Sequence, residues 1–189
     1  MIKKIILIIL FFSVIYTQGL FNSKKNWKEQ LYEKSSPAVV IVRTSDGVGS
    51  GFNIKKNGLV ITNYHVVEEA KEISVEFKNG DQYKVLHYTF VDKEKDFAVL
   101  KIPGSNLPTV KLGNSDQVKI GQEVVAIGNP IGQWHSITGG MISQIVKRPG
   151  HQLLQTDVTI APGSSGGPLF NSNNEVIGHN TDISGFQNS

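Results

Sequence analysis

Residues 38–67 read AVVIVRTSDGVGSGFNIKKNGLVITNYHVV, and this stretch decides the fold class. Short runs rich in Val and Ile alternate here with the turn dipeptides Asp46-Gly47 and Asn57-Gly58. Runs of β-branched residues bounded by such dipeptides are typical of antiparallel strands joined by tight turns. The stretch therefore predicts strands at 38–44, 49–54 and 59–62.

The same rhythm continues along the rest of the chain. Further strands are predicted at 72–77, 82–91, 97–102, 123–127, 136–146, 152–157, 168–170 and 175–179. No segment of helical periodicity separates them, so an alternating βαβ architecture fits poorly. Short strands of this spacing predict an all-β protein, either a barrel or a sandwich. The linker-like stretch that begins at Pro103 divides it into a first half over 37–104 and a second over 105–189.

The N-terminus has the pattern of a targeting segment. Lys3 and Lys4 precede an apolar run over residues 5–16, IILIILFFSVIY. As a helix this run would span about 18 Å, which is short of the roughly 30 Å hydrocarbon core of a bilayer. Residues 1–19 are therefore predicted to be a signal peptide, with a retained N-terminal membrane anchor as the alternative. The protein is expected to be periplasmic or secreted, or else anchored with its domain outside the cytoplasm.

Residues 20–36 differ from both neighbouring parts of the chain. They are mostly polar, with scattered apolar side chains such as Trp27 and Leu31, and Pro37 follows them. Proline does not continue a helix because it lacks an N–H and clashes with the preceding turn. The segment is predicted to be a short helix or linker that ends before Pro37.

Composition excludes several classes of function. The 189 residues include no Cys, so disulfides, thiolate metal sites and a Cys nucleophile are all excluded. The formal net charge of +3 includes the two lysines of the targeting segment, which leaves too little excess to indicate nucleic-acid binding. The histidines lack metal-ligand spacing. We therefore expect no cofactor, no metal and no nucleic-acid partner.

Two glycine-rich motifs have alternative interpretations that fail on context. Residues 47–51, GVGSG, look like a dinucleotide-binding loop, but a strand and a turn follow where that loop requires a helix. Residues 163–167, GSSGG, match the G-x-S-x-G pattern of α/β-hydrolases. That fold needs its acid and its histidine after the serine, and residues 166–189 are too short a stretch for them.

The serine of the second motif fits a different constellation, which lies upstream. His65, Asp96 and Ser165 occur in that order, the first two in the first β-rich half and the third between glycines in the second. A serine hydroxyl needs an imidazole to take its proton, and the imidazole needs a carboxylate to orient it. Main-chain amides must stabilise the oxyanion, and the amides of Gly163 and Ser165 are the candidates. This order predicts a Ser-His-Asp triad.

The chain resembles the HtrA/DegP-like branch of the trypsin-like serine proteases in five ordered blocks. These are the opening segment 33–40, the histidine block 49–67, the aspartate block 96–101, the second-barrel segments 112–115 and 121–130, and the serine block 155–169. The resemblance implies that His65 is the general base, Asp96 its orienting carboxylate and Ser165 the nucleophile. It also implies two perpendicular antiparallel β-barrels of the six-stranded trypsin-like type, with the active site between them.

The sequence departs from that family in its C-terminal part. Family members usually carry one or two PDZ domains after the protease, and this sequence shows none. The last barrel strand is not evident after residue 178, although Ser184 to Phe186 could begin it. We therefore expect the second barrel to be truncated at its C-terminus or to close differently.

The resemblance further implies a serine endopeptidase that hydrolyses unfolded or misfolded proteins through an acyl-enzyme. The substrate pocket would be formed by Ile160, Ala161, His179 and Asn180, and Ile160 favours a small or medium aliphatic P1 residue. A pocket selective for Glu would require His179 to turn inward. The family often forms homotrimers through N-terminal aromatic residues, here Phe21 or Trp27. The alternative is a catalytically weak or inactive descendant that binds polypeptides.

Overall fold

The computed structural model describes residues 25–129 and 135–181. The predicted targeting segment, Phe21 and the strand expected near Ser184 lie outside these residues. Helix α2 (Trp27–Ser35) confirms a helix before Pro37; it begins after Asn26, whose side chain accepts a hydrogen bond from the Glu29 amide, and a short 3₁₀ turn follows. Within the described part of the chain, no helix is long and apolar enough to cross a membrane.

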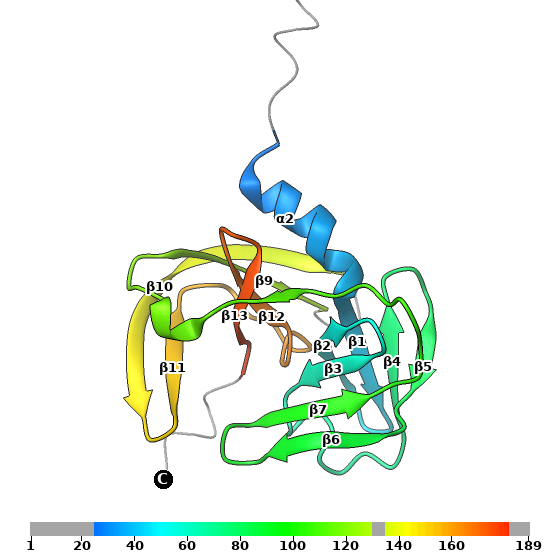
Figure 1. Ribbon diagram of the computed structural model, residues 1–189. Helices are drawn as coiled ribbons and strands as arrows, with labels where there is room; N and C mark the ends of the chain where they lie inside the picture. The colour runs from blue at the N-terminus through cyan, green and yellow to red at the C-terminus, as the bar shows by residue number, and fades with distance from the viewer. Residues whose placement is uncertain (1–24, 130–134, 182–189) are drawn as a thin grey trace, which may run out of the picture.

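The first half of the chain forms one seven-stranded sheet in the order β5-β4-β1-β2-β3-β7-β6 (Figure 1). Its strands are β1 (Val39–Thr44), β2 (Val48–Lys55), β3 (Leu59–Thr62), β4 (Ile73–Phe77), β5 (Gln82–Lys84), β6 (His87–Asp92) and β7 (Phe97–Lys101). Every neighbouring pair is antiparallel.

The sheet curls because the chain crosses from one of its edges to the other between β5 and β6. The Val85 amide donates to the carbonyl of Ile73, the first residue of β4, and the next amide, of Leu86, donates to the carbonyl of Lys101 in β7. The single strand predicted at 82–91 is therefore wrong. Residues 85–86 are a corner that brings the two ends of the sheet together.

The second half forms a six-stranded sheet in the order β11-β10-β9-β12-β13-β8. Its strands are β8 (Lys111–Leu112), β9 (Glu123–Gly128), β10 (Ser136–Arg148), β11 (His151–Thr156), β12 (Pro168–Asn171) and β13 (Glu175–His179). The two-residue strand β8 was not predicted, and it pairs parallel to β13. Within the described residues β11 and β8 remain the two open edges, so this curled sheet is incomplete.

Three apolar clusters hold these elements together. One fills the first sheet and is built around residues such as Val60, Val75 and Leu100. A smaller one lies within the second sheet, around Val124 and Ile142. The third joins the two halves, because it contains Val39, Phe52 and Ile61 from the first sheet, Ile127 and Phe170 from the second, and Leu31 from α2. This shared cluster fixes how the two halves face one another.

Candidate active site

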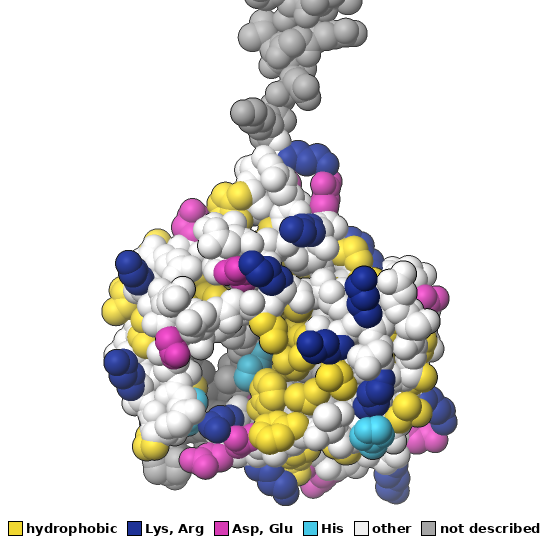
Figure 2. Space-filling model, in the orientation of Figure 1, with side chains coloured by type: hydrophobic (Ala, Val, Ile, Leu, Met, Phe, Trp, Pro, Cys, Tyr) yellow, Lys and Arg dark blue, Asp and Glu magenta, His cyan; other side chains and the backbone are white. Residues whose placement is uncertain are grey.

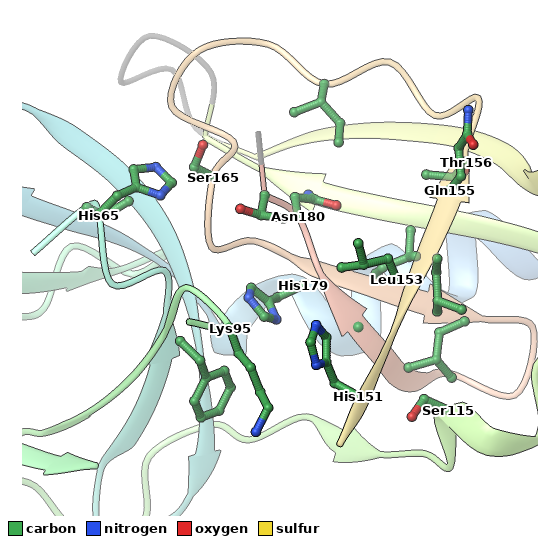
Figure 3. Close-up of a pocket in the computed structure, with 18 of the residues that line it drawn as sticks. His65, Lys95, Ser115, His151, Leu153, Gln155, Thr156, Ser165, His179 and Asn180 are labelled. Carbon is green, nitrogen blue, oxygen red and sulfur yellow. The ribbon is translucent and has the colours of Figure 1, made fainter. Parts of the chain in front are cut away.

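The three predicted triad residues lie at the ends of strands. His65 follows β3, Asp96 directly precedes β7, and Ser165 lies in the loop before β12. Thr62, at the end of β3, pairs with Ala98, near the start of β7, so His65 and Asp96 emerge at the same end of this strand pair. Figure 3 shows the His65 ring and Ser165 beside one another at the mouth of a cavity.

Asp96 holds His65 at two points. The His65 Nδ1 atom lies 2.7 Å from Asp96 Oδ2, and the His65 main-chain amide donates to Oδ1 at 2.9 Å. The carboxylate side chain is 10% exposed while the imidazole is 47% exposed. A buried carboxylate thus orients a half-exposed imidazole ring.

Two further side chains hold Asp96 itself. The Thr181 hydroxyl donates to Oδ2 at 2.7 Å, and the Asn63 amide donates to the Asp96 carbonyl at 3.0 Å. Burial alone would raise the pKa of Asp96, but the hydrogen bonds from His65 and Thr181 outweigh it and lower the pKa below its usual value. Asp96 is therefore ionised across the neutral range. Its φ of 50° lies in the left-handed region, where a non-glycine residue is strained.

Glycine is required at one position of the loop that carries Ser165. Gly166 has φ 85°, and a Cβ at this position would lie 2.3 Å from the Ser50 carbonyl oxygen and 2.5 Å from the Thr62 hydroxyl. No side chain fits there without moving main-chain atoms. At Gly166 the serine loop therefore packs directly against β2 and β3 of the first sheet.

Ser50 of β2 joins the first sheet to the second half of the molecule through three hydrogen bonds, two of them to the serine loop. Its amide donates to the Ser165 carbonyl at 2.8 Å, and its hydroxyl donates to the Gly163 carbonyl at 2.7 Å. The same hydroxyl accepts a hydrogen bond from the Asn129 amide at 2.9 Å. Residues 49–51 were predicted as part of a strand and of the histidine block, but this role of Ser50 was not predicted. Its flanking glycines, of which Gly51 would meet the Ile61 carbonyl if it carried a Cβ, were the indication of close main-chain approach.

Two amides in the serine loop are available to stabilise an oxyanion. Gly163 has φ 91°, and the Ser164 amide closes a turn onto the Ala161 carbonyl at 2.9 Å. Within the described residues, neither the Gly163 nor the Ser165 amide donates to a main-chain carbonyl. Main-chain amides of one turn that do not donate to a main-chain carbonyl can donate hydrogen bonds to a developing negative charge.

A cavity of ≈ 1590 Å³ runs from this site down between the two halves of the molecule. Its lining contains all the predicted site residues except Asp96, namely His65, Ser165, Gly163, Ile160, Ala161, His179 and Asn180. Figure 2 shows the hollow from the side on which it opens, and Figure 3 shows its interior. Apolar side chains from the second sheet, among them Leu154 and Ile177, complete it.

His179 lines the cavity and also packs against the first sheet. Its ring packs edge-on against Phe97 with centroids 5.6 Å apart, and Phe97 directly follows Asp96. Burial lowers the pKa of His179, outweighing the nearby Asp96, which acts to raise it. The ring is therefore neutral at neutral pH and offers no positive charge to an acidic substrate side chain. Across residues 25–129 and 135–181, no cluster of three or more His, Asp or Glu side chains could hold a metal ion.

Comparison with known protein families and sequences shows which family this chain belongs to. The family model described as a trypsin-like peptidase domain matches residues 49–178 of this chain. A probable periplasmic serine endoprotease, DegP-like, of Halomonas elongata is 48% identical over 140 residues, which cover 72% of this chain and 29% of that protein. The protein of the same name from Pseudomonas putida (strain W619) is 45% identical over 145 residues, 75% of this chain and 30% of the relative. The matched region thus spans less than a third of these relatives.

Solved structures have the same fold. The HtrA-type protease AlgW, solved with a tripeptide, superposes with a TM-score of 0.76 at 34% identity, covering 82% of this chain and 54% of that one. The serine endoprotease from Yersinia pestis gives 0.75 at 36% identity, over 85% and 58%. Deg5 gives 0.75 at 33% identity, over 86% and 87%. These likenesses confirm the predicted trypsin-like double barrel, with the second sheet incomplete.

Proposed function

Because this chain belongs to the trypsin-like peptidase family and is of the HtrA/DegP type, we propose that it is a serine endopeptidase. Its substrates are unfolded or misfolded proteins, and its catalytic residues are His65, Asp96 and Ser165. The observation that carries the proposal is the 2.7 Å contact between His65 Nδ1 and the buried Asp96 carboxylate, in the same cavity as a serine held between glycines.

The proposed reaction proceeds through an acyl-enzyme. Ser165 Oγ attacks the carbonyl carbon of the scissile bond while His65 takes the hydroxyl proton. Asp96 stabilises the resulting imidazolium, and the amides of Gly163 and Ser165 bind the oxyanion. His65 then gives its proton to the leaving amine. A water molecule, activated by the same imidazole, releases the acid and restores Ser165.

The pocket favours an aliphatic P1 side chain. Ile160 is 42% exposed and lines the cavity together with Ala161. Asp157, the acidic residue nearest before the serine loop, accepts a hydrogen bond from the Met141 amide at 2.7 Å and is therefore engaged with β10. Neither it nor the neutral His179 would select a charged P1 residue, so we propose Val, Ala or Leu. Asn180 forms part of the same wall.

We propose that the protein acts in the periplasm or outside the cell. The support is the targeting pattern of residues 1–19 and the word periplasmic in the names of its relatives. Membrane anchoring through residues 1–19 and assembly into a homotrimer are two further, independent parts of this proposal. Flotation of the full chain with lipid vesicles tests the anchor, and size-exclusion chromatography of residues 20–189 tests the trimer.

The proposal is tested by replacing the nucleophile. Ser165→Ala should lower kcat on casein by about 10⁶, the loss typical when a triad serine is removed. A fluorophosphonate probe should label the parent chain at Ser165 and leave the variant unlabelled. Ser164→Ala, which changes the adjacent serine, is the matched control and should keep labelling. Binding of casein by the parent chain without cleavage or labelling would instead support the inactive polypeptide-binding descendant.

A further inference from the structure

Strand β6 is exposed along nearly its whole length. Five of its six residues are exposed and only Asp92 is partly buried, yet the strand carries large apolar side chains. Phe90 is 53% exposed, Tyr88 41% and Val91 36%. The register with β7 puts Phe90 opposite Val99 on one face of the strand, and Tyr88 and Val91 opposite the core residues Leu100 and Ala98 on the other. We call Phe90, together with Phe97 beside it, the β6 surface. Apolar side chains gathered on an exposed strand are unusual in a monomer, because they invite association with another chain.

The β6 surface is continuous with the candidate active site. Phe90 packs edge-on against Phe97, with ring centroids 6.1 Å apart, and both side chains line the cavity that holds His65 and Ser165. Figure 2 shows hydrophobic side chains gathered over the part of the molecule where β6 and β7 lie, beside the hollow. A polypeptide that leaves the cavity on this side meets the β6 surface first.

Two contacts attach β6 and its turn to the loop that carries His65. The Tyr88 hydroxyl donates to the Val67 carbonyl at 2.8 Å. The Lys93 ammonium lies 5.1 Å from the centroid of the Tyr64 ring, next to His65 in sequence. The β6 surface is thus held at a fixed place relative to the catalytic base.

The strand also offers an edge for main-chain hydrogen bonds. β6 is the terminal strand of its sheet and, within the described residues, pairs only with β7. An extended peptide can add to such an edge, with main-chain bonds giving affinity and alternate side chains giving selectivity.

We propose that β6 is a second docking site, which binds an extended apolar segment of the same polypeptide whose scissile bond lies at Ser165. This inference rests on the proposed function and specifies its substrate class: unfolded chains that carry an apolar segment at some distance from an aliphatic P1 residue. A short peptide that fills only the cavity near Ser165 does not reach β6.

The test compares two serine substitutions at exposed apolar positions. Phe90→Ser removes the centre of the β6 surface. Leu86→Ser is the matched control, since Leu86 is 59% exposed just before β6 but does not line the cavity. Each is made in the Ser165→Ala background, and binding of labelled unfolded casein is followed by fluorescence anisotropy. Phe90→Ser should weaken binding about fivefold or more, and Leu86→Ser should leave it unchanged.

Steady-state kinetics of the active enzyme separates docking from damage. In a chain that keeps Ser165, Phe90→Ser should raise KM for casein by a larger factor than KM for a short aliphatic p-nitroanilide peptide. A distorted active site would instead raise both KM values by the same factor. Phe90→Thr, which removes the same ring but keeps a β-branched side chain suited to a strand, serves if Phe90→Ser fails to fold. Equal losses for the two substrates, equal effects of Leu86→Ser, or a change of oligomeric state on Phe90→Ser without casein would overturn the inference. Because anisotropy needs no turnover, the docking site is tested even if the proposed protease activity fails.

Discussion

At the scale of single residues, Asp96 carries most of the constraints in the site. Its two carboxylate oxygens accept hydrogen bonds from the His65 amide and the Thr181 hydroxyl and meet the His65 ring, and its carbonyl accepts one from Asn63. Its left-handed backbone is maintained by these partners. Changes at Asp96 should therefore affect the tautomer of His65 before they affect the fold.

Asp96→Asn should lower kcat by about 10⁴, because an amide presents a donor where His65 needs an acceptor and so favours the wrong tautomer. Thr181→Val removes one hydrogen bond to the same carboxylate. It should lower kcat about tenfold, which corresponds to about 1–1.5 kcal/mol. Both variants should keep the circular dichroism spectrum of the parent. Equal losses in the two variants would contradict the roles assigned here.

The activity should depend on the protonation of His65. An imidazole ordinarily titrates near ~6.5, and only its neutral form can accept the serine proton. Since Asp96 has a lowered pKa and is already ionised, kcat/KM should rise as a single titration through roughly pH 6–7.5. A flat profile between about pH 5 and 8 would exclude a histidine base.

His179 should make the fold sensitive to acid. Burial lowers its pKa, so the folded state resists a proton that the unfolded state accepts below ~6.5. The neutral ring's contribution to the free energy of unfolding is fully present above that pH. It is lost as the pH falls toward the folded-state pKa, by up to ~1.4 kcal/mol per pH unit. When the pH is lowered from about 7.5 to 5, the Tm of His179→Leu should therefore fall less than the Tm of the parent. Identical losses would show that the ring takes up no extra proton on unfolding.

At the scale of elements, the serine loop and the first sheet are in contact at main-chain level. Gly166 leaves room for the Ser50 carbonyl, and its own amide donates to the Asn180 carbonyl at 2.8 Å at the end of β13. Asn180 in turn donates from its amide to Gly167 at 2.8 Å. The loop is thus held between β2 on one side and the segment after β13 on the other.

Gly166→Ala should abolish fluorophosphonate labelling of Ser165, because the new Cβ would displace the loop from Ser50. Gly80→Ala is the matched control: Gly80 has φ 89°, close to that of Gly166, but nothing lies within 4 Å of its Cβ position. The control isolates the cost of the left-handed backbone, about 1–2 kcal/mol, and should label normally. If both variants label alike, close packing at Gly166 does not position the nucleophile.

At the scale of the whole molecule, the site forms where two curled sheets meet. The apolar cluster shared by the sheets and α2 sets their orientation, and Ser50 adds the polar connection between them. The placement of His65 relative to Ser165 depends on how the halves dock, because the two residues belong to different sheets.

Ser50→Ala should lower both stability and kcat. It leaves the Gly163 carbonyl and the Asn129 amide without the hydroxyl that each now contacts, at a cost of about 1–3 kcal/mol. Ser45→Ala, at an exposed turn of the same sheet, should change stability by less than about 0.5 kcal/mol. Thermal unfolding and casein turnover measure the two effects. A stable Ser50→Ala variant with full turnover would show that the apolar cluster alone aligns the halves.

The all-β class and most of the strands could be predicted from the sequence, and so could the candidate residues His65, Asp96 and Ser165, which the fold brings to one region. Strands are readable because β-branched runs and turn dipeptides are local, and the order of His, Asp and Ser is a property of the chain alone. The corner at residues 85–86 could not be predicted, since a crossing between sheet edges depends on which strands it joins. The same holds for Ser50 and Thr181, whose partners lie 113 and 85 residues away. Their side chains carry no local pattern, because their roles arise from contacts made when the two sheets close on one another.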